Sequence, residues 1–379
     1  MSSTPEIERL VESTKNYRNY PLNLIDKSRW DKAKLEEFHR RLCHAQAALD
    51  IFLPPKKRFE LPVWDIAEDR TSRYTKNETN ADITKRFEVG DEEPKLDPQV
   101  RFIFMSTIIY QKPLAINEDA FKKVVSYHQV TPRFLDYLEF FGLRSTLAEK
   151  ININGLYAEK TLDTPSADEQ IPELRRSGRG YQIGYTLKSI DLNVTPAMVK
   201  PATIYHRFDL EYGTQLWIFV DHLMEFQRMA EGSQLIVANN VDSLQEQFQA
   251  TLNNHIVLAR WMNVGWREHV DGLPEIMDNR PRKRVSLWTD EGQAFMGTRE
   301  TLKTAFLSMD MNCEIMGAVR NFYTSIVDDR SFPEDMDGMA KKLVGEFVIR
   351  LDEEIEKMAV QRDRAKQLQD IIDNARTIR

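Results

Sequence analysis

Residues 181–190 read YQIGYTLKSI, and apolar and polar side chains alternate along them. Side chains of a strand point to opposite faces in turn, so this alternation predicts a half-buried β-strand. Residues 203–210 and 214–220 follow and are separated by Glu211-Tyr212-Gly213. This arrangement predicts an antiparallel hairpin in which Gly213 absorbs the turn. The three segments predict a sheet in the middle of the chain.

Strand and helix signals precede this sheet. Residues 101–110 (RFIFMSTIIY) are rich in aromatic and β-branched residues, which predicts a buried strand. Asn117 predicts the cap of one helix, and Thr131-Pro132 predicts the start of another that stops at Gly142. An earlier helix, ended by Pro54-Pro55, is predicted from apolar residues at three- and four-residue steps: Leu35, Phe38, Leu42, Ala45 and Leu49.

Three segments lack a regular pattern. Residues 20–25 are expected to be extended, because the residue before Pro21 avoids the helical region. Residues 65–98 and 151–180 carry many charges and turn formers, so both are predicted to be loops.

The pattern turns helical after residue 221. Helices are predicted over residues 241–270 and about 300–327, and Ser331 with Glu334 resembles a capping box that starts a last helix of about 45 residues. Its apolar residues form a stripe close to a heptad repeat: Leu351, Ile355, Met358, Ala365, Leu368, Ile372 and Ala375. The stripe either packs on this chain's own helices or mediates self-association.

These signals together predict an α/β (α+β) fold, with a mixed sheet flanked by helices and followed by long C-terminal helices. We expect an N-terminal segment over residues 1–30, an α/β domain over 31–235 and a long-helix region over 236–379.

Composition limits the function. The 52 basic and 59 acidic residues give a net charge of −7, which argues against a dedicated nucleic-acid binder. Residues 1–16 lack the apolar run of a signal peptide, and the longest apolar stretch, 102–110, is far shorter than a membrane helix. We therefore expect a cytoplasmic protein without a membrane span, in which Cys43 and Cys313 are reduced thiols.

Motifs of known enzymes are missing from the sequence. Residues 178–184 (GRGYQIG) approach a dinucleotide fingerprint, but they have one residue too many and precede a strand instead of following one. We therefore expect no enzyme. An unrecognised enzyme would use the one local polar cluster: Tyr185, His206, Arg207 and Asp209.

Ligand-binding candidates are weak. His39 and Cys43 lie four residues apart on a helix, but no second pair completes a zinc site. Carboxylates that suit Mg²⁺ occur at Asp335, Asp337 and Asp352-Glu353-Glu354. Each group either attracts Mg²⁺ or simply forms a solvated helix face. Two basic clusters fit either an anion site or a solvated loop: Arg175, Arg176 and Arg179, and Arg280, Arg282, Lys283 and Arg284.

Four stretches together resemble the cytosolic domain of fungal CorA-like divalent-cation transporters over roughly residues 20–330. They are HQVTPRFLD ending in FFG (128–142), YQIGYTLKSID (181–191), the hairpin YHRFD to LWI (205–218), and Trp261 and Trp266 with the helix that ends near Asn321-Phe322-Tyr323. The glycine-methionine-asparagine signature of the family's membrane part is missing, since Met262-Asn263 and Met311-Asn312 lack the preceding glycine.

The resemblance implies a soluble regulatory or cation-sensing part of a Mg²⁺ transport system that is not itself a pore. It implies Mg²⁺ as a possible ligand, although no metal-binding residue can be carried over. Partners would be other copies of the chain or a full-length CorA-like protein, bound through the C-terminal helix. The alternative is an interaction module that keeps the fold without an ion function.

Overall fold

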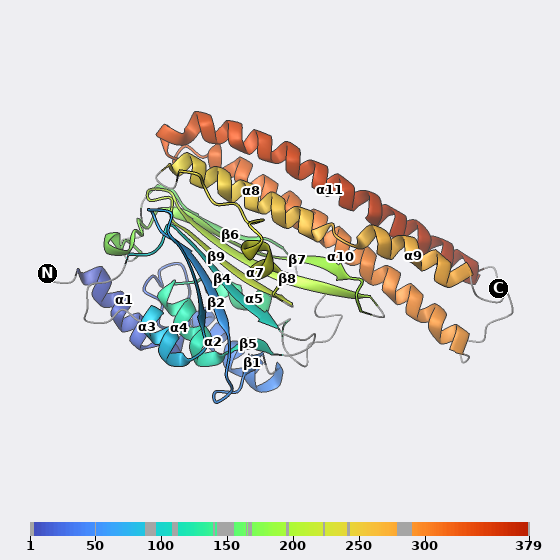
Figure 1. The fold of residues 1–379 in the computed structure, drawn as a ribbon, viewed down its shortest axis with the longest axis horizontal. Helices are drawn as coiled ribbons and strands as arrows, with labels where there is room; N and C mark the ends of the chain where they lie inside the picture. Colours follow the sequence, from blue (N-terminus) through green and yellow to red (C-terminus); the bar gives the residue numbers. More distant parts are fainter. Residues whose placement is uncertain are drawn as a thin grey trace.

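A central β-sheet lies between two layers of helices (Figure 1). The computed structural model describes residues 4–49, 51–87, 96–107, 113–138, 141, 155–163, 165, 169–194, 197–222, 224–240, 243–278 and 290–377. The N-terminal helices cover one face of the sheet, and the long C-terminal helices cover the other. This arrangement confirms the predicted fold class.

The main sheet has seven strands and is mixed. Its order is β3 (Ser72–Asn77), β2 (Leu61–Ile66), β4 (Val100–Thr107), β9 (Gln215–His222), β8 (Met198–Asp209), β7 (Gly180–Asp191) and β6 (Tyr157–Thr161). Only the β4–β9 pair among these is parallel. A separate parallel pair joins β1 (Phe52–Leu53) to β5 (Leu114–Asn117). The predicted hairpin is present as β8 and β9, with Gly213 at a φ of +64°.

Short helices form the N-terminal layer. They are α1 (Pro5–Lys15), α2 (Lys32–Leu49), α3 (Asn80–Phe87), α4 (Glu118–Tyr127) and α5 (Leu135–Leu138), with 3₁₀ turns at Tyr17–Asn19, Pro132–Phe134 and Pro172–Leu174. Asn117 caps α4 as predicted, because its Oδ1 accepts a hydrogen bond of 2.8 Å from the Ala120 amide.

The opposite layer consists of four longer helices and the short helix α7. They are α7 (Glu225–Glu231), α8 (Leu244–Met262), α9 (Trp266–Asp278), α10 (Asp290–Val327) and α11 (Glu334–Thr377). The single helix predicted over 241–270 is two helices, because Gly265 between them has a φ of +83°. A Cβ at this position would lie 2.7 Å from Ile190, so the turn is held close to β7.

The central strands of the sheet contribute to two apolar cores. In β4, Phe102 and Phe104 face the long helices, whereas Ile103 and Met105 face the N-terminal layer. Strand β7 is accordingly buried along nearly its whole length. The prediction of a half-buried strand was wrong, since the sequence pattern does not reveal that helices cover both faces.

Two predicted loops contain regular structure. The segment predicted as a loop over 65–98 carries the end of β2, all of β3, and α3, and residues 88–95 lie outside the described residues. Strand β3 is polar because it is an exposed edge strand, and α3 buries only Ile83 and Phe87. The second predicted loop contains β6, another edge strand. The expected extended segment at 20–25 is largely a turn.

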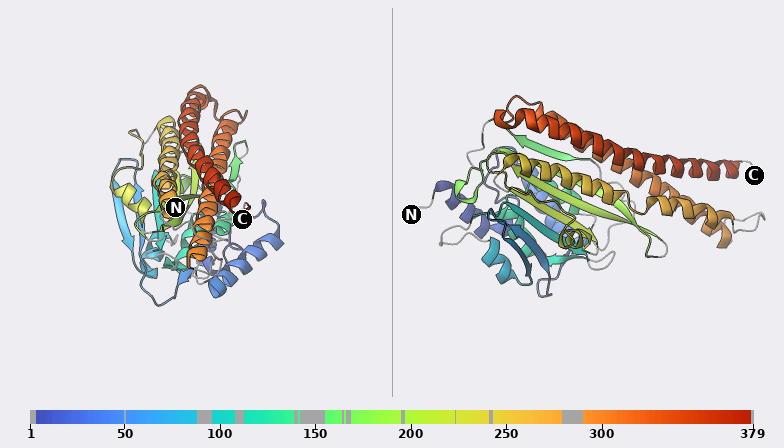
Figure 2. Two further views of the ribbon diagram at one scale, coloured as in Figure 1. Left: turned by 90° about the vertical axis from the view of Figure 1, so that its right-hand side faces the viewer. Right: turned by 45° about the horizontal axis from the view of Figure 1, so that its top comes forward.

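Helix α11 has 44 residues, close to the predicted length. It packs on α8, α9 and α10 (Figure 2). Leu351, Met358 and Ala365 of the predicted stripe are fully buried in the core with these helices. The stripe therefore packs within the chain. In the described part of the chain, no helix combines the length and the apolar character required to span a membrane.

Candidate functional site

The predicted polar cluster does not form one site. Tyr185 and His206 point toward the long helices and belong to a buried aromatic group there. Arg207 and Asp209 alternate with His206 on the strand and line a cavity on the opposite face of the sheet. The sheet thus separates the four side chains into two pairs.

On the helical side, Tyr185 joins a chain of hydrogen bonds, whereas His206 only packs beside it. The Tyr185 hydroxyl lies 2.7 Å from Nδ1 of His255, and Nε2 of His255 lies 2.8 Å from the Tyr323 hydroxyl. Burial lowers the pKa of His255 to about 3, so the ring is neutral. These residues are far apart in sequence, which is why sequence analysis missed His255 and Tyr323. The group ties β7 to α8 and α10.

A small cavity lies on the other face, between the sheet and the N-terminal segment. It has a volume of about 70 Å³, room for a few water molecules or one small anion. Four arginines line it: Arg29, Arg176, Arg179 and Arg207. Three carboxylates line it as well: Glu159, Glu169 and Asp209. We call this site the arginine cavity.

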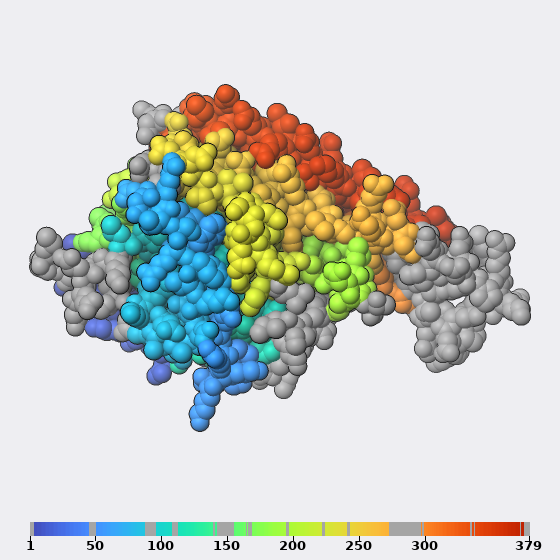
Figure 3. Space-filling model, viewed as in Figure 1, coloured from blue at the N-terminus to red at the C-terminus, as the bar shows by residue number. Residues whose placement is uncertain are grey.

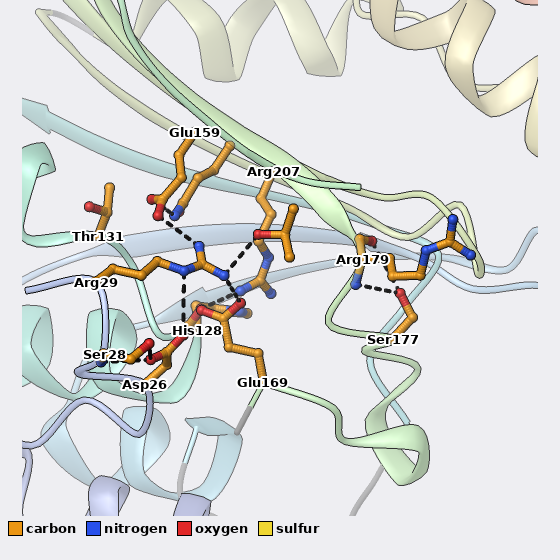
Figure 4. Close-up of polar contacts among 12 residues, drawn as sticks. Asp26, Ser28, Arg29, His128, Thr131, Glu159, Glu169, Ser177, Arg179 and Arg207 are labelled. Atoms are coloured by element: carbon orange, nitrogen blue, oxygen red, sulfur yellow. Dashed lines mark hydrogen bonds and ion pairs between the residues drawn. The ribbon is translucent and has the colours of Figure 1, made fainter. Parts of the chain in front are cut away.

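Arg29 is saturated by acidic neighbours (Figure 4). Its guanidinium contacts Glu159 at 2.7 Å, Glu169 at 3.2 Å and Asp26 at 3.4 Å, and it donates a further hydrogen bond to Thr161. Burial raises the pKa of Glu169, and Arg29 opposes that rise. Arg29 therefore offsets part of the negative charge of these three carboxylates.

Arg176 belongs to a buried ion-pair network. Its Nε donates to Asp97 at 2.8 Å, and its Nη1 donates to the Tyr127 carbonyl at 2.8 Å. Asp97 also contacts Arg101, and Arg101 in turn contacts Asp65. Burial opposes ionisation of Asp97, but the two guanidinium groups hold its pKa below the ordinary value.

The sequence left two alternatives for the loop from Arg175 to Arg179, an anion site or a solvated loop. The structure agrees with a solvated loop only in part. Arg176 is 7% exposed, so a solvated role is wrong for this residue. Arg175 pairs with Glu68, and Arg179 donates to the Leu162 carbonyl at 2.9 Å. The other basic cluster, residues 280–284, lies outside the described residues.

The metal candidates do not assemble. Sγ of Cys43 lies 4.0 Å from Nε2 of His39, but within the described residues no three or more His, Cys, Asp or Glu side chains group as metal ligands. Glu354 is buried against Asn263 and Lys357, so the prediction that it lies on a solvated helix face is wrong. The side chains of Asp335 and Asp337 lie outside the described residues.

The outer face of α11 is the second candidate surface. It carries three exposed apolar side chains, Ile349, Val360 and Ile371, with exposed fractions of 64%, 57% and 60%. Exposed glutamates at positions 346, 353 and 356 lie on the same helix. In Figure 3, α11 forms the outer edge of the helical layer. We call this surface the outer face of α11.

The fold and these surfaces define an α/β/α domain that carries a layer of long helices. The sequence profile of the CorA-like transporters matches residues 12–285, and the chain belongs to this family. No curated protein matches the sequence.

Three solved structures are similar to the chain at low sequence identity. The cytoplasmic domain of ZntB from Vibrio parahaemolyticus RIMD 2210633 has 11% identity and a TM-score of 0.33, over 83% of this chain and 99% of that one. Full-length CmaX has 12% identity and a TM-score of 0.38, over 86% and 79%. The soluble domain of CorA from Methanocaldococcus jannaschii has 10% identity and a TM-score of 0.40, over 82% and 95%.

Proposed function

We propose that this chain is a cytosolic regulatory part of a CorA-like transport system of the fungal type, in which Mg²⁺ controls association through the outer face of α11. The observation that carries the proposal is the combination of exposed apolar residues and glutamates on that face. Membership of a transporter family supports the same role.

The spacing of the apolar residues favours a contact along the helix. Ile349, Val360 and Ile371 follow one another every eleven residues. Three turns of an α-helix take about 10.8 residues, so the three side chains lie nearly in line. Leu351, Met358 and Ala365 of the stripe predicted from the sequence are buried inside the chain, whereas this second line is exposed and available to another copy or to a full-length partner.

The glutamates on this face supply the cation dependence. Two copies in contact would bring Glu346, Glu353 and Glu356 near their counterparts, and like charges repel in that arrangement. Mg²⁺ prefers carboxylate and water oxygens, so it would relieve the repulsion. A site completed by two chains also agrees with the finding that the described residues of one chain hold no metal cluster.

The second candidate is an interaction module that associates without ions. Pairing of other acidic residues with arginines favours it: Asp352 lies 2.6 Å from Arg320, and Asp310 lies 3.0 Å from Arg362. These carboxylates are committed to holding α10 against α11.

Light scattering during a Mg²⁺ titration separates the two. We expect the mass of the wild-type chain to rise at millimolar Mg²⁺ and to fall again when EDTA is added. The double variant Glu353→Gln and Glu356→Gln should associate without Mg²⁺, because it has lost the repulsion. The variant Val360→Ser should stay dissociated under all conditions.

Leu192→Ser serves as the matched control, because Leu192 is an exposed apolar residue in the turn after β7 and lies outside α11. If the mass of the wild-type chain does not change with Mg²⁺ but the mass of Val360→Ser is lower, the result would support the interaction module. A mass unchanged by every one of these variants would refute both roles for the outer face of α11.

A further inference from the structure

The arginine cavity contains a buried guanidinium group that the protein does not fully satisfy. Nη2 of Arg176 has no hydrogen-bond partner, although the residue is 7% exposed. Buried charged groups normally have all their donors paired, because an unmet donor costs about 1–3 kcal/mol. A water molecule or a bound anion is the kind of group that could accept a hydrogen bond from this donor.

The charges behind Arg176 are also unbalanced. The buried network contains three guanidinium groups, those of Arg86, Arg101 and Arg176, and two carboxylates, those of Asp65 and Asp97. His128 adds no negative charge, and burial with the surrounding arginines lowers its pKa so that the ring is neutral. One positive charge in the network therefore lacks a counter-charge among these contacts.

The carboxylates of the cavity are committed to other partners. Glu159 and Glu169 contact Arg29. Asp209 accepts hydrogen bonds from the Ser177 hydroxyl and from three backbone amides, those of Ser177, Glu211 and Tyr212. These carboxylates already have donors, and none of them accepts a hydrogen bond from Nη2 of Arg176.

Two further guanidinium groups line the same cavity. Arg207 donates from Nη1 to the His128 carbonyl at 2.6 Å, and Arg179 donates from Nε to the Leu162 carbonyl. A guanidinium has five N–H donors, so each of these bonds uses one of five. Both residues are half-buried, where a charge-assisted hydrogen bond is stronger than at the surface.

We propose that the arginine cavity binds a small oxyanion of the size of phosphate, held by Arg176, Arg179 and Arg207. The cavity volume of about 70 Å³ fits such an ion. Guanidinium groups present paired donors that match phosphate or carboxylate oxygens. The site lies across the sheet from α11, so its occupancy is a property separate from the association proposed above.

The test uses isothermal titration calorimetry of the full chain at low ionic strength, with inorganic phosphate as one probe and malonate as the other. We expect saturable binding of at least one probe. Arg179→Gln and Arg207→Gln should each weaken binding roughly tenfold, the effect of losing one charge-assisted hydrogen bond. Tighter binding of phosphate would assign the site to phosphate, and tighter binding of malonate would assign it to carboxylates.

Arg175→Gln is the matched control, because Arg175 lies in the same loop but does not line this cavity. It should bind both probes like the wild type. Thermal melts with and without each probe test the variants independently: the probe should raise the melting temperature of the wild type and of Arg175→Gln, and much less that of Arg207→Gln. No saturable binding, or equal weakening in all three variants, would overturn the proposal.

Discussion

The ring of His206 packs against the indole of Trp217 with 3.8 Å between the ring centroids and an angle of 49° between the ring planes. The two residues are directly opposite each other on β8 and β9. Neither nitrogen of His206 has a hydrogen-bond partner in the described structure, and burial lowers the pKa of the ring well below its ordinary value. The imidazole therefore acts here as a neutral, flat packing group.

We predict that His206→Leu is neutral or stabilises the protein by about 1 kcal/mol, because it removes two unmet polar atoms from the core. His255→Leu should instead destabilise it by about 2–4 kcal/mol, since the hydroxyls of Tyr185 and Tyr323 both lose their partner. Urea unfolding of the two variants measures the difference. Equal losses in both would contradict a role for His206 as packing alone.

Asp97→Asn should lower the free energy of unfolding by about 3–5 kcal/mol, because it leaves Arg101 and Arg176 buried with fewer counter-charges. The control is Asp352→Asn, which breaks the half-exposed pair with Arg320 between α10 and α11 and should cost at most about 1 kcal/mol. Chemical denaturation gives both values. If the two substitutions cost the same, the arginine network is not a major source of stability.

Asp221 makes stability depend on pH. Burial raises its pKa to about 7, against the opposing hydrogen bonds from Ser106 and the Phe226 amide. The folded chain therefore keeps a proton between about pH 4 and pH 7 that the unfolded chain releases. This carboxyl should lower the free energy of unfolding as the pH rises through that window, by at most about 4 kcal/mol.

The variant Asp221→Asn mimics the protonated carboxyl and cannot titrate. Unfolding measured from pH 4.5 to pH 8 should show the wild type losing stability relative to this variant. Parallel pH profiles for the two proteins would contradict the raised pKa. Ser106→Ala controls for simple loss of the hydrogen bond. Because this bond opposes the raised pKa of Asp221, the variant should keep the direction of the wild-type pH dependence and extend it to higher pH.

The periodic parts of the sequence were sufficient to predict much of the fold. The hairpin of β8 and β9, the buried strand β4, the cap at Asn117 and the long last helix are all present. Each has a strong local signal: alternation, a β-branched run, a capping residue or an unbroken helical pattern. Edge strands β3 and β6 were missed, since exposed polar strands resemble loops in composition.

The candidate sites depended on contacts between distant parts of the chain. Arg176 and Asp97 are 79 residues apart, and Tyr185 and His255 are 70 apart. Local sequence patterns carry no information about such pairs. The predicted cluster of Tyr185, His206, Arg207 and Asp209 shows the converse. These residues are close in sequence or in register, but the sheet separates them because neighbours on a strand point to different faces.

The sequence by itself determined the central strands β4, β7, β8 and β9 and the long last helix, because backbone preference and the period of apolar residues are local properties. Only the tertiary structure decided that both faces of the sheet are covered, that the apolar stripe of α11 is internal, and that an arginine of a polar loop is buried. Burial and charge pairing arise from segments that meet in space, so they become fixed only when the two helical layers close on the sheet.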